Sequence, residues 1–477
     1  MNRPAPTPAC TDPSCCATSL PVLYLTGGSI LWLLAGLGLA LLASLKQHQP
    51  WLLASCEWVT YGRLDAASRT ALVHGFFSQM GLGLGLWLLA RTGGTQIAAP
   101  GIVFIAGLVW NAVLTLGVAG ILVEGPSGHS SLELPGQLVT VLTVVSTVLC
   151  LLGFATFAKR TEGPTVPTQW FVLAALLALP LFAITSQVTL SIFPERGVLQ
   201  AVIDGWNGQG LLLLWLAPLA LASLYFFIPD IGGRPLRSPA FAKLGFWAWV
   251  FFASWTGASN LVGGPVPAWM VTVSIAASVL LLIPVAFISL NLHGVAPVSA
   301  LGRSTALRFA ALSAISFTVV GILTALTAPR CAQQVLGLTQ FTVAVRELFL
   351  FGFVGPALFA GYYAVVPKLA GRGFPCRLSP VAHLGLTVLG LGIMVLSCGV
   401  GGWLQGWALA DCKVGFPEVA AHLQIWLKLH TLGLAVFAFG QTAVLANSVW
   451  LLVECLLPFG KPALALFTET SPAGAGK

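Results

Sequence analysis

Long stretches without any charged side chain constrain this sequence more than any other feature. Eleven intervals of at least 20 residues contain no Asp, Glu, Lys or Arg, and each is strongly apolar. A helix that crosses the hydrocarbon core of a membrane needs about 20 such residues. The intervals are residues 13–45, 70–90, 92–123, 134–158, 163–194, 205–229, 244–302, 309–329, 348–367, 378–410 and 429–453. We therefore predict an all-α integral membrane protein, because helices satisfy their own backbone groups in lipid.

One of these intervals is long enough for two spans. Residues 244–302 are interrupted near their middle by the segment GGPVP at 263–267. Pro and Gly at this density are typical of a connection between helices. Eleven intervals thus predict twelve transmembrane helices, in a membrane domain that covers residues 20–457. A flexible N-terminal tail (1–19) and a C-terminal tail (458–477) flank this domain.

Composition excludes several other classes of protein. Hydrophobic residues make up 57% of the 477 residues and charged residues only 8%. So few charged residues cannot cover the surface of a soluble protein. A disordered chain is excluded as well, because it would need a low hydrophobic content and a high net charge. The net charge of +8 is spread thinly, so we predict no nucleic-acid partner and expect the lipid bilayer instead. Cys10, Cys15 and Cys16 lie in the polar tail, where free thiols are a better interpretation than a metal site.

The distribution of basic residues predicts the orientation. If the N-terminus is cytoplasmic, the cytoplasmic connections carry eleven basic residues against two acidic ones, whereas the opposite side carries eight basic and nine acidic residues. The cytoplasmic basic residues are Arg91, Lys159, Arg160, Arg234, Arg237, Lys243, Arg303, Arg308, Lys368, Arg372 and Arg377. By the positive-inside rule both termini are cytoplasmic, and we predict a multi-pass protein of a bacterial-type inner membrane.

Five ordered segments resemble one known family. They are YGRLDAASRTALVHGF (61–76), GWNGQGLLLLWLAPLALASLYFFIPD (205–230), FWAWVFFASWTGASNLVGGPVPAW (246–269), LTQFTVAVRELFLFGF (338–353) and GGWLQGWALAD (401–411). Together they resemble subunit I of the haem-copper oxidases, most of all the cbb3-type cytochrome c oxidases, from about residue 50 to about residue 450. The resemblance implies a twelve-helix bundle with both termini in the cytoplasm.

The same resemblance implies two haems and one copper ion, held by six histidines, and here the chain departs from the family. The haem-ligand positions are Ser68 on the second predicted helix and Val345 and Glu347 on the tenth; the copper-ligand positions are Gln209, Ser259 and Asn260; and Ala253 stands at the redox tyrosine. Haem iron and copper need imidazole or sulfur ligands at such points. We therefore predict no catalytic residues, no haem, no copper and no other cofactor.

The seven histidines of the chain offer one serious substitute. His74 lies six residues after Ser68, which places it about 120° around an ideal helix and about 9 Å deeper. A lone histidine in a membrane helix is more often a hydrogen-bonded core residue than a ligand. His430 is not expected to be a ligand, because the resemblance implies that the twelfth helix carries none.

Other side chains near the vacated positions predict what replaces the cofactors. Arg69, Arg346 and Glu347 form a candidate polar cluster, in which Glu347 pairs with either arginine; the alternative is that both charges of the tenth helix are interfacial. Bulky residues at Phe349, Phe351 and 211–215 predict a central cavity that is largely filled.

Two cysteines could form a disulfide on the non-cytoplasmic side. Cys331 and Cys412 lie in separate predicted connections on that side, where disulfides persist. The bridge requires their Cα atoms to come within about 7 Å, and two unpaired thiols are the commoner case.

Three functions stay open. The first is a non-catalytic homologue of the oxidase subunit that acts as a structural or regulatory subunit of a respiratory complex, or in its assembly. The second is an active cbb3-type terminal oxidase, which the resemblance alone would imply. The third is a solute-binding or lipid-binding protein that uses the vacated cavity.

Overall fold

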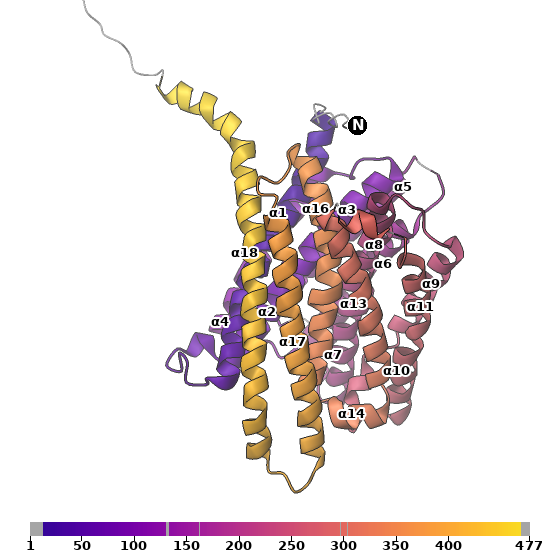
Figure 1. Cartoon of the computed structure of the whole chain (residues 1–477), viewed down its shortest axis with the longest axis vertical. Helices are drawn as coiled ribbons and strands as arrows, with labels where there is room; N and C mark the ends of the chain where they lie inside the picture. The colour runs from indigo at the N-terminus through magenta and orange to yellow at the C-terminus, as the bar shows by residue number, and fades with distance from the viewer. Residues whose placement is uncertain (1–12, 130–132, 162, 296, 303, 469–477) are drawn as a thin grey trace, which may run out of the picture.

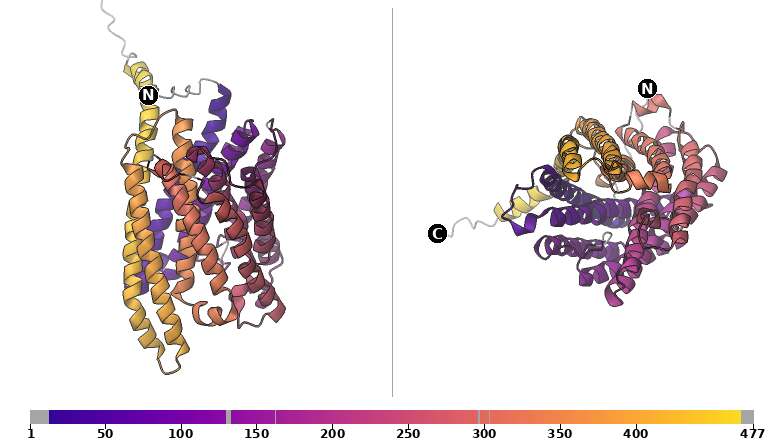
Figure 2. Two further views of the ribbon diagram at one scale, coloured as in Figure 1. Left: turned by 45° about the vertical axis from the view of Figure 1, so that its right-hand side comes forward. Right: turned by 90° about the horizontal axis from the view of Figure 1, so that it is seen from below.

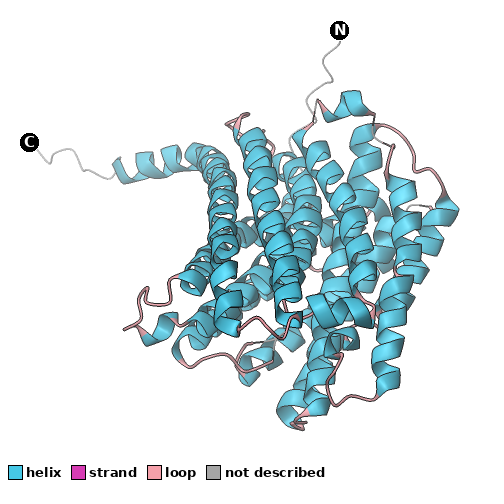
Figure 3. Ribbon diagram, turned by 60° about the horizontal axis from the view of Figure 1, so that its bottom comes forward, coloured by secondary structure: helices cyan, strands magenta, loops and turns pink. Residues whose placement is uncertain are grey.

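The fold is entirely helical over the described part of the chain, as predicted (Figure 3). A computed structural model describes residues 13–129, 133–161, 163–295, 297–302 and 304–468. Residues 1–12 of the predicted N-terminal tail, with Cys10, lie outside this range, as do the side chains of Cys15 and Cys16 and residues 469–477. The domain boundaries at residues 20 and 457 stay predictions.

The described residues contain eleven helices that are long and apolar enough to cross a membrane. Eight of them form the outer parts of the bundle. They are α1 (Pro13–His48), α4 (Pro100–Val123), α5 (Gly136–Ala158), α6 (Pro167–Ser186) continued by η3 (Gln187–Ile192), the pair α10 (Ala268–Leu280) and α11 (Leu282–Leu292), α13 (Thr305–Thr327), α17 (Ser379–Ala410) and α18 (Phe416–Thr468). Short helices η1 (Glu57–Val59), η5 (Ala258–Leu261), α12 (Val298–Leu301) and α14 (Arg330–Leu336) connect them.

The seventh predicted span is α9 (Pro239–Ala253). Its 15 residues rise only about 22 Å, which is less than the roughly 30 Å of a hydrocarbon core. The described residues therefore contain eleven helices of spanning length and not the predicted twelve, because α9 is too short. The chain leaves the helical path here because Gly257 adopts a φ of 112°, which favours glycine.

Three spans form the centre of the bundle and share one construction. Each has an α-helix, then a π-helical segment, then a second α-helix: α2 (Tyr61–Thr70), η2 (Ala71–Phe77) and α3 (Ser78–Gly93); α7 (Val198–Gly210), η4 (Leu211–Leu216) and α8 (Ala217–Gly232); and α15 (Gln340–Glu347), η6 (Leu348–Val354) and α16 (Gly355–Ala370). Their apolar windows are 89%, 83% and 83% buried, against 33–56% for the other eight. These three spans are therefore enclosed by protein.

Each of the three central π-helical segments, η2, η4 and η6, has a main-chain carbonyl that accepts a side-chain hydrogen bond from a neighbouring helix. Trp110 Nε1 donates to His74 O at 2.9 Å, Trp249 Nε1 to Leu213 O at 2.7 Å, and Ser313 Oγ to Phe353 O at 2.6 Å. A π-turn disturbs the regular helical ladder, and buried carbonyls in lipid require partners. These bonds therefore stabilise the widened turns.

The last two long helices form a separate feature. Figure 1 shows α17 and α18 as an antiparallel pair at one edge of the bundle, and the turned view in Figure 2 agrees. The pair is attached to the centre through α15, whose first turn approaches α17 very closely at Gly402. A Cβ atom at Gly402 would overlap the backbone of Gln340 and Phe341.

We expect Gly402→Ala to destabilise the protein by about 1–3 kcal/mol, because the added methyl group must push α15 and α17 apart. The matched control is Gly392→Ala on the same helix, where a Cβ atom would meet nothing within 4 Å. The measurement is the unfolding temperature of both variants in detergent. Equal temperatures for the two variants would show that the close approach carries no stability.

Candidate functional site

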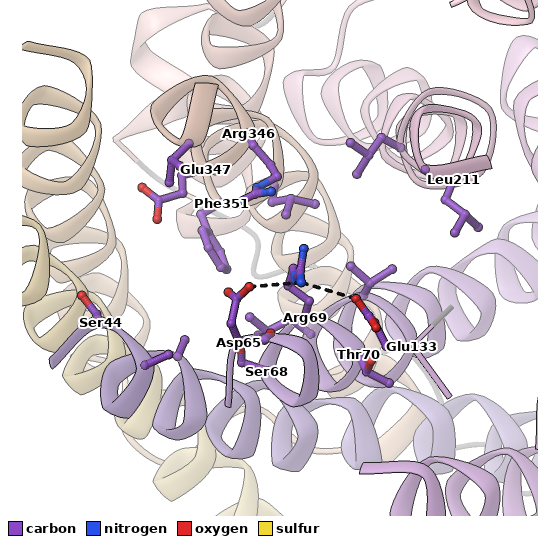
Figure 4. Close-up of a pocket in the computed structure, with 18 of the residues that line it drawn as sticks. Ser44, Asp65, Ser68, Arg69, Thr70, Glu133, Leu211, Arg346, Glu347 and Phe351 are labelled. Carbon is purple, nitrogen blue, oxygen red and sulfur yellow. Dashed lines mark hydrogen bonds and ion pairs between the residues drawn. The ribbon is translucent and has the colours of Figure 1, made fainter. Parts of the chain in front are cut away.

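A cavity of about 440 Å³ lies between α1, α2, α7, α15 and α18 (Figure 4). This volume is in the range of small-molecule sites. The cavity extends to the protein surface at Tyr61, which is 44% exposed. It is lined by polar and charged side chains at one end and by Leu72, Leu350 and Phe351 further in.

Four of the six predicted ligand positions line this cavity. They are Ser68, Gln209, Asn260 and Glu347. Val345 instead packs against the hydrophobic core, and Ser259 is buried, with its main-chain N–H donating to Ser274 Oγ at 2.9 Å. The bundle therefore gathers residues from four separate segments of the sequence around one space.

The chemistry of these positions does not fit haem or copper. The Ser68 hydroxyl donates to Asp65 O at 2.8 Å, within its own helix. Gln209 and Asn260 offer amides and Glu347 a carboxylate, none of which replaces an imidazole on haem iron or copper.

The close approach of two glycines places Asn260 beside α7. A Cβ atom on Gly257 would lie 2.7 Å from Gly205 O, so the two backbones are almost in contact. Since Gly205, Gln209 and Asn260 all line the cavity, this contact fixes one of its walls.

Arg69 is held by two carboxylates at the polar end of the cavity. Its guanidinium lies 3.1 Å from Asp65, four residues earlier on α2, and 3.5 Å from Glu133 (Figure 4). Asp204 also lines the cavity, 3.6 Å from the His129 ring. Burial raises the pKa of the Glu133 carboxyl, and the positive charge of Arg69 opposes that rise.

The predicted cluster of Arg69, Arg346 and Glu347 is thus brought to one cavity, but the predicted pairing is wrong. Within the described residues, Glu347 forms no ion pair with either arginine; its Oε1 lies 2.7 Å from His430 Nε2 on α18. Arg346 and Glu347 are neighbours on α15, about 100° apart around the helix, and their side chains point in different directions (Figure 4).

His430 is the residue that the sequence analysis missed. It is 8% exposed and lines the cavity between Glu347 and Ser44. It was excluded on the family's ligand pattern, although a His430–Thr431 pair on an apolar helix signals a buried polar contact. The sequence pattern does not identify the partner of His430, because Glu347 lies 83 residues earlier in the chain.

The other substitute, His74, also lies at the cavity. It is 2% exposed within η2 and is one of the lining residues. By contrast, His383 lies between Tyr363 and Gln441, with its ring nitrogens 2.9 and 2.8 Å from their oxygens, as a hydrogen-bonded core residue.

The predicted filling of the cavity is correct only for its apolar part. Phe351 packs between Phe77 and Phe437, with ring centroids 5.9 and 4.9 Å away, and Trp215 is fully buried, donating to Ser78 Oγ at 2.9 Å. The polar part, lined by residues such as Asp65, Arg69 and Glu133, stays open.

The predicted disulfide is not formed. Cys331 and Cys412 are both exposed and free. Cys331 lies in α14 and Cys412 in the turn between α17 and α18, so each belongs to a different connection.

Comparison with known proteins identifies the family. The sequence profile described as Cytochrome C and Quinol oxidase polypeptide I matches residues 21–436. The chain belongs to this family. Its relatives include the cbb3-type cytochrome c oxidase subunit CcoN1 of Stutzerimonas stutzeri, which is 22% identical over 447 residues, covering 90% of this chain and 94% of that protein.

Two further likenesses agree with this assignment. A cytochrome c oxidase subunit 1 homolog of Azorhizobium caulinodans is 22% identical over 467 residues, covering 94% of this chain and 84% of that protein. A solved haem-copper terminal oxidase dimer has the same fold, with a TM-score of 0.68 at 12% identity, covering 92% of this chain and 84% of that one. The resemblance seen in the sequence is confirmed.

We expect the stability contributed by Glu133 to fall as the pH rises. Its pKa in the folded state is raised above the ordinary value of 4.5, so folding favours the protonated form. That contribution is complete below the ordinary pKa and is lost as the pH rises through the folded-state pKa. The unfolding temperature of the natural protein, relative to Glu133→Gln, should therefore fall as the pH rises from the ordinary pKa of 4.5 through the higher folded-state pKa.

The exposed residue Glu57 supplies the control for this experiment, because Glu57→Gln changes the net charge equally. A difference between the natural protein and Glu133→Gln that is constant with pH, or rises with it, would contradict the expectation.

Proposed function

We propose that this chain is a non-catalytic member of the oxidase subunit I family and serves as a structural or regulatory subunit associated with a respiratory complex. One observation carries the proposal: the cavity wall presents Ser68, Gln209, Asn260 and Glu347 where the family's ligands are predicted. The fold persists around this cavity, whereas the imidazoles that would hold two haems and a copper are replaced.

The proposed topology has twelve spans and both termini in the cytoplasm of a bacterial-type inner membrane. The excess of basic residues in alternate connections supports the orientation. We assign α9 as a short twelfth span, because Trp247 and Phe251 are 68% and 61% exposed and suit contact with lipid or with another subunit.

The cavity itself supports a second candidate function. A polar space of about 440 Å³ that opens at Tyr61 could hold a small solute, with Arg346 as a cation that forms no ion pair with any described residue. An active cbb3-type terminal oxidase, reducing oxygen and translocating protons, is the remaining alternative, and the donor chemistry of the ligand positions opposes it.

We expect the protein, purified in mild detergent, to contain far less than one haem and one copper per chain. The reason is that no imidazole occupies the six predicted ligand positions. The measurements are a pyridine haemochrome assay, the visible spectrum and elemental analysis for copper. A relative that keeps its histidines, produced in the same host, controls for the supply of haem.

A stoichiometric haem with a Soret band would support the oxidase alternative instead. Respiratory-complex subunits that co-purify in the same preparation distinguish a subunit of a complex from a separate solute-binding protein.

A further inference from the structure

Three side chains from three helices converge on one point at the edge of the cavity. They are Glu347 on α15, Cys398 on α17 and His430 on α18, and one ligand atom of each lies within 4.8 Å of the others. Cys398 is 2% exposed and His430 is 8% exposed. Glu347 is one of the haem-ligand positions predicted from the family, whereas Cys398 and His430 are at no predicted ligand position.

A hydroxyl group on a neighbouring helix orients the His430 ring. Its Nδ1 lies 3.1 Å from Ser44 Oγ on α1, and that hydroxyl is also 2.8 Å from Thr431 Oγ1. Nε2 therefore faces Glu347, at 2.7 Å. Histidines that bind metals typically have the outer ring nitrogen fixed by a hydrogen bond in this way.

The other two groups retain unused bonding capacity. Glu347 Oε2 is buried and has no hydrogen-bond partner. The Cys398 sulfur lies within 4.8 Å of the ligand atoms of Glu347 and His430 and has a long contact, 3.9 Å, to Gln340 Oε1. A buried carboxylate oxygen without a partner is costly, and a cation at this point would compensate it.

We propose that Glu347, Cys398 and His430 bind a Zn²⁺ ion. Thiolate, imidazole and carboxylate together are a donor set for zinc, whereas calcium and magnesium select oxygen ligands only. Copper(I) favours sulfur and imidazole without a carboxylate. The Gln340 side-chain oxygen, or a water molecule from the cavity, completes the tetrahedron.

The geometry requires only small adjustments. Zinc bonds of about 2.0–2.3 Å hold tetrahedral ligand atoms roughly 3.3–3.8 Å apart. Glu347 and His430, now at 2.7 Å, separate slightly as the ion enters between them. Binding releases two protons to solvent through the cavity: the thiol proton of Cys398, and the proton that His430 Nε2 and Glu347 Oε1 share in their hydrogen bond.

The ion would join α15 to the α17–α18 pair at the cavity wall. The contacts already present between these helices include close packing at Gly402, the bond from Gln340 N–H to Gln405 Oε1, and the Glu347–His430 contact. A zinc bridge is therefore a structural cross-link beside the space that the family's cofactors are expected to fill, and it does not depend on the proposed role in a complex.

The test measures zinc on the full-length protein in detergent, purified without a polyhistidine tag. Metal-stripped protein is dialysed against Zn²⁺ and then against metal-free buffer, and retained zinc is counted per chain.

We expect one zinc in the natural protein, and at least a tenfold loss of affinity in Cys398→Ser and Glu347→Gln. Ser44→Ala should weaken binding about 10–100-fold, since it removes the group that orients His430. Cys376→Ser, a half-buried cysteine outside the cluster, is the matched control.

A second measurement does not depend on the folding of any variant. Zinc should slow alkylation of Cys398 in the natural protein while leaving alkylation of Cys376 unchanged, as read by mass spectrometry. Cobalt bound in place of zinc should give a thiolate-to-cobalt absorption band that Cys398→Ser lacks. Absence of retained zinc in the natural protein would overturn the proposal. Zinc retained equally by Cys398→Ser and Glu347→Gln would reveal adventitious sites and would overturn it as well.

Discussion

Charged and polar groups inside an apolar bundle need partners, and the central part of this structure depends on that requirement. It explains why Arg69 lies between Asp65 and Glu133, and why Glu347 meets His430 rather than facing lipid. The same requirement acts on the backbone, where the carbonyls of the π-helical segments accept bonds from Trp110, Trp249 and Ser313. Polar contacts, rather than apolar packing alone, therefore specify how the central helices fit together.

The sequence predicted the spans well because hydropathy is a local property. Every charge-free interval corresponds to a helix, and the interruption at 263–267 separates α9 from α10. The shortness of α9 was not predicted, since the positive φ of Gly257 that redirects the chain depends on its contact with Gly205. The π-helical segments were not predicted either, because the side chains that stabilise them lie on other helices.

Several residues of the candidate site could be predicted from the sequence, but the contacts between them could not. Ser68, Gln209 and Glu347 were located by their order in the family's motifs, and the fold brings them to one cavity. The same family pattern excluded His430. That pattern gives the positions of the ligands, but it does not tell which residue contacts a side chain, such as Glu347, that stands in place of a ligand. The contact between α15 and α18 is a tertiary property, as is the separation of Cys331 from Cys412.

The cavity also changes how a membrane potential would act on this protein. Water in a space lined by carboxylates and arginines would give it a high permittivity, so little of the voltage would fall across it. Most of the voltage would fall instead across the apolar part of the bundle, where Phe351 packs between Phe77 and Phe437. Each elementary charge that crosses the whole field gains about 2.3 kcal/mol per 100 mV. In this chain that energy would be delivered over a shorter distance than the thickness of the bilayer.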